Sequence, residues 1–314
     1  MRTALFVPDA PSAKKRPLHR SLEREFAATV FPLEPGAPFP DVTGFDLVIS
    51  KLRFRHLAKM DGPSWGATSA LRVHWDEDVF HDGLWDESEF RGLWSEWLPS
   101  LDFDLIVTTG QRSRDYLTDR GFAAAVVHKG FSEQYFFDKD QDRAADIAMF
   151  GQEYRSRLLA RRALARAGVE VRQVQSPYEQ LSDALNRSLA SLSCTLDTTL
   201  RGGRIMAPLA RRLPELLMRT GAAPEPMLKF FESAASGCAP FTDYSPDLED
   251  LGFIDGDTAV VFTDIPELVE KAREYFATPD RLAAIGSRAA ALAASRHTWR
   301  HRARELRAVV ETLM

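Results

Sequence analysis

The sequence predicts an α/β protein with two Rossmann-like domains, each built on a doubly wound parallel sheet, that face a cleft. First, short apolar runs alternate with helical patterns, which is typical of parallel βαβ units. Second, the length of 314 residues suits about two domains. Third, a polar and aromatic connector at residues 129–146 interrupts the alternation, which then begins again. Two such sheets in tandem leave a cleft between the carboxyl ends of their strands, where α/β folds bind ligands.

The first predicted domain covers residues 1–140. Residues 32–44 are dense in Pro and Gly, which predicts a loop between two of its strands. The strands are expected at Ala4–Val7, Thr29–Leu33, Asp46–Ser50, Leu71–His74, Asp104–Thr108 and Ala124–His128. The helices are expected at Leu18–Ala28, Glu87–Leu98 and Gln111–Asp119.

The second predicted domain covers residues 141–292, and residues 293–314 are expected to form a C-terminal helix at the domain junction. A helix that opens before Phe230 ends at Gly237, because glycine commonly terminates helices. The other helices are expected at Arg155–Ala167, Tyr178–Ser188 and Ile265–Phe276. The strands are expected at Ile147–Phe150, Val169–Val174, Leu189–Leu196, Cys238–Thr242 and Ala259–Phe262.

The composition excludes several classes of protein. Two cysteines give neither a disulfide framework nor metal-ligand spacing, which favours a reducing compartment. The N-terminal apolar run is too short for a signal peptide, and no stretch approaches the roughly 18 apolar residues of a membrane-spanning helix. A net charge of −5 argues against a general nucleic-acid binder without excluding one. We therefore expect a cytoplasmic protein without a transmembrane segment.

One carboxylate stands out in the segment KFFESAASGCAPFTD, residues 229–243. Glu232 lies on a helix whose other side chains are mostly Phe, Ala and Ser. It is either a solvated residue favoured near the helix start by the helix dipole, or a hydrogen-bond acceptor for a ribose, as in nucleotide-binding α/β domains. Residue chemistry alone favours the solvated interpretation.

A second polar group leaves a predicted strand in RVHWDEDVF, residues 72–80. His74, Asp76, Glu77 and Asp78 stand at the carboxyl end of that strand, where an acceptor hydroxyl could be hydrogen-bonded or deprotonated. The alternative is a polar turn that caps the next helix. An Asp-x-Asp pair could also bind a divalent cation, which we do not favour.

Two basic segments permit similar alternatives. Lys14, Lys15 and Arg16 form either a solvated loop or a contact to a phosphorylated acceptor. The Arg-rich stretch 198–226 is either a loop with a surface helix or a basic lip that faces phosphates or an acidic acceptor.

The order and spacing of several segments carry a family resemblance over residues 146–302. These segments are DIAMFGQEYRSR, KFFESAASGCAPFTD, LEDLGFIDGDTAVVF, DIPELVEKAREYFATPDRLAAIG and SRHTWRHR. The chain resembles the GT-B glycosyltransferases, in particular the retaining group-1 superfamily and its spore-maturation (CgeB-like) branch. The first domain resembles the family more loosely.

The resemblance implies a set of donor-binding residues. It places Gly151 beside the donor, Arg155 or Arg157 and Lys229 on the diphosphate, and Glu232 on the ribose, while Ser236 and Gly237 keep the helix end slim beside the ligand. Many relatives carry an earlier glutamate where this chain has Pro224, with Glu225 one residue away.

The implied function is the transfer of a sugar from a nucleotide diphosphate sugar to an acceptor hydroxyl, with retention. His74 or Asp76 would orient the acceptor, which is an unknown saccharide, lipid-linked precursor, protein or small molecule. The family needs no metal or other cofactor, since cationic side chains and helix dipoles stabilise the departing diphosphate. A non-catalytic two-lobed binding or partner subunit and a nucleotide-sugar epimerase are the alternatives.

Overall fold

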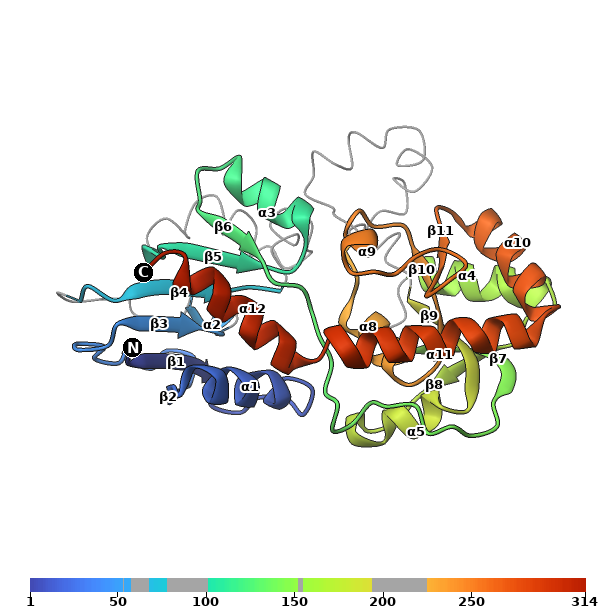
Figure 1. Ribbon diagram of the computed structural model, residues 1–314, viewed down its shortest axis with the longest axis horizontal. Coiled ribbons are helices and arrows are strands. Elements are labelled where there is room, and N and C mark those ends of the chain that lie inside the picture. Colours follow the sequence, from blue (N-terminus) through green and yellow to red (C-terminus); the bar gives the residue numbers. More distant parts are fainter. Residues whose placement is uncertain (53, 58–67, 78–100, 152–154, 194–224) are drawn as a thin grey trace. The chain divides into compact units, whose positions relative to one another are not determined.

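The computed structural model (Figure 1) describes residues 1–52, 54–57, 68–77, 101–151, 155–193 and 225–314. The predicted helix Glu87–Leu98, Asp78 and most of the Arg-rich stretch lie outside these residues. The chain forms two compact units. Unit 1 contains Met1–His128 and Trp299–Met314, and unit 2 contains the described residues between Lys129 and Thr298. The chain passes from unit 1 to unit 2 after His128, and the predicted boundary at residue 140 stays a prediction.

Unit 1 is built on a parallel sheet with strand order β2-β1-β3-β4-β5-β6 among the described residues. Its strands are β1 (Thr3–Pro8), β2 (Thr29–Leu33), β3 (Leu47–Ser50), β4 (Leu71–Trp75), β5 (Leu105–Thr108) and β6 (Ala124–Val126). Its helices are α1 (Arg16–Phe26), α2 (Phe54–Leu57), α3 (Gln111–Thr118) and α12 (Trp299–Glu311). The strand order reverses between β1 and β3, which makes their carboxyl ends the topological switch point of this sheet.

The C-terminal helix α12 packs against α1 within unit 1. Arg307 forms an ion pair of 2.9 Å with Glu25 and lies over the ring of Phe26. Within the predicted C-terminal segment 293–314, α11 ends at Arg296 and α12 covers Trp299–Glu311. Its place at a domain junction stays a prediction.

Unit 2 is built on a second parallel sheet, with strand order β11-β10-β9-β7-β8 among the described residues. Its strands are β7 (Ala144–Phe150), β8 (Val171–Val174), β9 (Ser188–Ser193), β10 (Ala239–Asp243) and β11 (Val260–Phe262). Its helical segments are α4 (Arg155–Arg166), the short 3₁₀ helix η5 (Tyr178–Gln180), α5 (Leu181–Leu185), α8 (Leu228–Ala235), α9 (Asp247–Asp250), α10 (Ile265–Phe276) and α11 (Pro279–Arg296). The predicted α/β class with two parallel sheets is confirmed.

Both faces of the second sheet are covered by helices, as alternating apolar residues of β7 require. Ile147 and Met149 enter one hydrophobic cluster, which α4 and α10 complete. Ala148 and Phe150 enter the opposite cluster, to which α5, α8 and part of α11 contribute. No described helix has both the length and the apolar composition that crossing a bilayer demands.

One predicted helix is wrong in extent. The segment Tyr178–Ser188 holds a 3₁₀ turn and a short α-helix that ends at Leu185. Ser188 instead begins β9, because it pairs with Ala144 of β7.

Candidate functional site

Helix α8 brings the predicted residues of unit 2 to both ends of the sheet, some to the carboxyl ends of the strands and some to the amino ends. The helix follows β9 and precedes β10, and these strands are parallel neighbours. Its first turn, with Lys229, therefore lies at the carboxyl ends of the strands, and Glu232 follows one turn later on the same face. Ser236 and Gly237, which directly follow the last turn, lie at the amino ends of the strands. The carboxyl-end edge is where open α/β sheets bind ligands.

Gly151 and Lys229 meet at the carboxyl end of β7. Gly151 has a positive φ of 79°, and a side chain at this position would collide with the ammonium group and the last methylene of Lys229. The Lys229 Nζ atom lies 5.8 Å from the ring centroid of Phe150. The glycine thus gives both the turn and the room for a cation at the end of the strand.

The two predicted arginines differ in what the structure shows of them. Arg157 is 1% exposed and donates a hydrogen bond of 3.1 Å to the carbonyl oxygen of Phe150. It therefore supports the last residue of β7 from inside the unit. Arg155 begins α4, and its side chain lies outside the described part of the structure.

Glu232 is buried and held by a tyrosine. The hydroxyl of Tyr178 donates a hydrogen bond of 2.8 Å to Oε1 of Glu232. Glu232 as a whole residue is only 2% exposed. Burial, and then the charge and the hydrogen bond of Glu232, raise the pKa of Tyr178 far above its usual range. Tyr178 therefore remains a donor, and the solvated interpretation of Glu232 does not fit its burial.

Glu225 follows Pro224, the position at which many relatives carry a glutamate, and it belongs to a buried ion pair. Its carboxylate is bound to the ammonium group of Lys129, and both residues are 3% exposed. Lys129 starts the connector of unit 2, so the pair fixes that connector to the segment that leads into α8. Neither this pairing nor the role of Tyr178 was predicted from the sequence.

Ser236 and Gly237 are packed against protein at the other end of α8, and their place beside the donor stays a prediction. The carbonyl oxygen of Ser236 accepts a hydrogen bond of 2.9 Å from Arg143. A side chain at Gly237, whose φ is 76°, would meet Arg143 and Asp138. Helix α8 rises about 1.5 Å per residue, which carries its last turn away from the end of the sheet where Lys229 lies.

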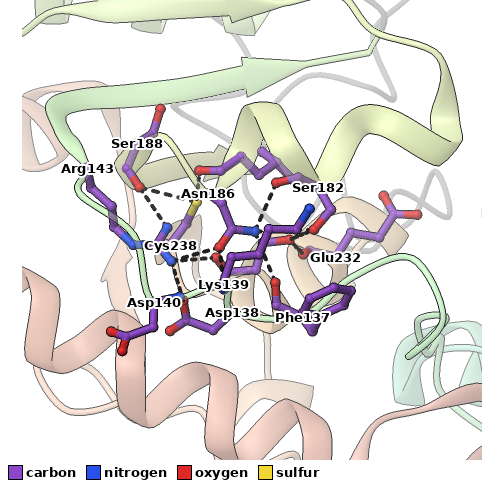
Figure 2. A network of polar contacts seen from close by, with 12 residues as sticks. Phe137, Asp138, Lys139, Asp140, Arg143, Ser182, Asn186, Ser188, Glu232 and Cys238 are labelled. Atoms are coloured by element: carbon purple, nitrogen blue, oxygen red, sulfur yellow. Dashed lines mark hydrogen bonds and ion pairs between the residues drawn. The ribbon is translucent and has the colours of Figure 1, made fainter.

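A polar network anchors the connector to this end of α8 (Figure 2). Asn186, fully buried, accepts hydrogen bonds from the Lys139 amide and Arg143 and donates to the carbonyl oxygens of Phe137 and Ser182. The network continues to α8 through the hydroxyl of Ser236, which donates a hydrogen bond of 2.9 Å to the carbonyl oxygen of Glu232. The backbone of Glu232 is therefore held as well as its side chain.

In unit 1 the structure brings His74 and Asp76 together at the end of β4. His74 is fully buried, stacks on Phe103, and its Nδ1 lies 3.2 Å from the hydroxyl of Ser50. Its Nε2 lies 3.7 Å from Asp76 Oδ2. The imidazole therefore lies behind the carboxylate rather than on the surface.

Glu77 is bound to two lysines. One carboxylate oxygen is paired with Lys15 of the β1–α1 loop, and the other lies 2.7 Å from Lys51, which follows β3. Burial, and then Lys51 and Lys15, lower the pKa of the nearby His19 to about 3. Lys15, one of the predicted loop cations, thus ties its loop to the end of β4.

Within the described ranges, no three His, Cys, Asp or Glu side chains are grouped to hold a metal ion.

Comparison with solved structures defines the class of fold. Sucrose-phosphate synthase from Thermosynechococcus elongatus superposes with a TM-score of 0.68 at 11% identity, over 100% of this chain and 99% of that chain. HepE of Anabaena, solved in complex with UDP-glucose, gives 0.59 at 11% identity, over 99% and 100%. A glycosyltransferase from Rickettsia africae gives 0.52 at 11% identity, over 98% and 97%. The fold is that of the GT-B glycosyltransferases.

The sequence comparison then gives the family. The model described as glycosyl transferase-like matches residues 136–308, which is more than half of the chain. The chain belongs to this glycosyl transferase-like family. No curated protein sequence matches it.

Proposed function

We propose that the protein is a glycosyltransferase that moves a sugar from a nucleotide diphosphate sugar to an acceptor hydroxyl, with retention and without a metal ion. The observation that carries the proposal is the first half of α8, where Lys229 lies beside Gly151 at the carboxyl end of β7 and Glu232 lies one turn further. Such a site offers a cation for a diphosphate and a carboxylate for a ribose. The spore-maturation (CgeB-like) branch and a cytoplasmic location are part of the same proposal.

The residues would act mainly by electrostatics and positioning. Charge develops on the departing diphosphate and on an oxocarbenium-like sugar during transfer. Lys229 would stabilise the diphosphate, with Arg155 as a second cation, whereas Arg157 would keep the end of β7 in place. Glu232 would accept hydrogen bonds from the ribose.

On the acceptor side we propose Asp76 as the group that orients the hydroxyl. His74 is fully buried and contacts Asp76 from behind, so its part would be to orient that carboxylate. The chemical nature of the acceptor, whether saccharide, lipid-linked precursor, protein or small molecule, is left to an acceptor screen.

Calorimetric titration tests the donor site directly. HepE was solved with UDP-glucose, so UDP-glucose is the first ligand, followed by other uridine, guanosine and deoxythymidine diphosphate sugars. We expect Glu232→Gln and Lys229→Met each to weaken donor binding by about tenfold or more, since each removes a hydrogen bond or ion pair to a charged group. Glu170→Gln, an exposed substitution in unit 2, is the matched control and should bind as the wild type does.

The alternatives make different predictions in the same experiments. A non-catalytic binding subunit would bind a donor but neither transfer nor hydrolyse its sugar, and an epimerase would change the sugar without an acceptor. Failure of every nucleotide sugar to bind would overturn the proposal.

A further inference from the structure

Tyr178 contacts the carboxylate of Glu232, which we proposed above as the group that binds the ribose. It lies in η5, which follows β8 by a short loop, so it approaches the site from the carboxyl-end edge of the sheet. Its hydroxyl donates a hydrogen bond of 2.8 Å to Oε1 of Glu232. The two residues are 54 positions apart in the chain, and the contact is made only when the two elements pack together.

The ring of Tyr178 is fixed by two aromatic neighbours from the connector. Tyr135 and Phe136 contact it edge to face, with centroid distances of 5.7 and 5.3 Å. The hydroxyl therefore has little freedom to follow the carboxylate, and the carboxylate must instead orient toward the hydroxyl. The backbone of Glu232 is fixed independently by the hydroxyl of Ser236.

This arrangement has a consequence for ligand recognition. A carboxylate can accept up to about four hydrogen bonds, and Tyr178 occupies one of these positions and sets the plane of the group. Ribose hydroxyls must then meet acceptor positions that are already fixed, so little ordering is needed on binding. A freely rotating carboxylate would distinguish less between a sugar with hydroxyls and one without.

We propose that Tyr178 is a positioning residue for Glu232 that makes the site select nucleotides with an intact ribose over those that lack the ribose hydroxyls. The inference rests on the proposed ribose role of Glu232. It adds a specificity-determining group that contacts no part of the ligand itself.

The test is a set of binding measurements on the full chain. The ligand is whichever of UDP, GDP and ADP the wild type binds most tightly, paired with its 2′,3′-dideoxy analogue. We expect the wild type to prefer the ribonucleotide by about tenfold or more, as for hydrogen bonds to a charged acceptor. In Tyr178→Phe, which keeps the ring and its aromatic contacts, this preference should fall at least about threefold, mainly through weaker ribonucleotide binding.

Two further variants separate the possible outcomes. Tyr135→Phe removes a neighbouring hydroxyl that does not bond Glu232 in the described contacts, and it should keep the wild-type preference. Glu232→Gln should lose most of the preference. If Glu232→Gln loses it and Tyr178→Phe keeps it, the positioning role is overturned while the ribose site stands. If Glu232→Gln keeps the preference, or no nucleoside diphosphate binds, the ribose site itself is overturned, and the inference with it.

A readout in turnover gives a second check. Loss of carboxylate positioning should raise the KM for the donor in Tyr178→Phe and leave kcat nearly unchanged, because the ribose is bound in the ground state and in the transition state alike. A fall in kcat at constant KM would contradict the proposed role.

Discussion

Replacing Gly286 by alanine tests how tightly α11 is docked on the strand that follows α8. A Cβ atom at position 286 would lie 3.0 Å from the amide nitrogen of Ala239 and 3.2 Å from the carbonyl carbon of Gly237, and closer still to the carbonyl oxygen of Gly237. All three atoms belong to the backbone, so no side-chain rotation can relieve the collision. Either α11 or the Gly237 turn must move.

The expected cost follows from two opposing terms. Overpacking of a tight interior contact costs about 1–3 kcal/mol, while alanine in place of glycine within a helix contributes up to about 1 kcal/mol in the other direction. We expect Gly286→Ala to lower the free energy of unfolding by about 1–2 kcal/mol. Because the turn at Gly237 ends the helix that carries Glu232, donor binding should weaken as well.

Urea unfolding followed by circular dichroism measures the effect. Ser287→Ala, on the exposed side of the same helix, is the control, and its unfolding midpoint should match or slightly exceed that of the wild type. A Gly286→Ala protein as stable as this control would show that the close approach of α11 to the Gly237 turn is not a constraint.

Three other properties follow from buried groups. Lys129→Met should destabilise the protein by about 3–5 kcal/mol, since it leaves Glu225 without its buried countercharge; the Lys129→Met, Glu225→Gln double variant should recover part of this in urea unfolding, and no recovery would contradict a coupled pair. His19 stays neutral when folded and takes up a proton when unfolded, because its folded pKa is about 3, so the free energy of unfolding should fall as the pH drops below about 6.5. Between pH 7 and pH 5 the fall should be smaller in His19→Gln by roughly 2 kcal/mol, and equal falls in both proteins would refute this. Burial raises the pKa of Cys238 to about 12, so a Cys194→Ser protein should react with a thiol reagent at pH 8 only after unfolding; rapid reaction of the folded protein would argue against that burial.

The two parallel sheets were predictable because the apolar strand patterns and their alternation with helices along the chain are local and regular. Thr29–Leu33 of β2 and Ile265–Phe276 of α10 occur with the predicted bounds, and the other described strands differ only at their ends. By contrast, α11 was not among the predicted elements, although proline at its start and its many alanines favour a helix. The helix expected over Tyr178–Ser188 failed because pairing of Ser188 with β7 overrides local propensity.

The candidate site was predictable only where single residues carry a recognisable pattern. The chain positions of Gly151, Lys229 and Glu232 were enough to single them out, and their roles on the donor stay predictions. Tyr178 and Lys129 could not be found in this way, because they meet Glu232 and Glu225 across 54 and 96 residues of sequence. Such partners depend on how elements pack, which no local pattern encodes.

The two ends of unit 2 are adjacent, and this bears on the order in which the protein is completed during synthesis. The Phe131 amide donates a hydrogen bond of 3.1 Å to the carbonyl oxygen of His297, and Phe131 forms an isolated parallel β-bridge with Thr298. Unit 2 is thus an insertion between β6 and α12 of unit 1. Because α12 follows unit 2 in the chain, unit 1 acquires the helix that covers α1 only after unit 2 has been made. During synthesis, the unit begun first therefore lacks one of its helices until the unit inserted into it is complete.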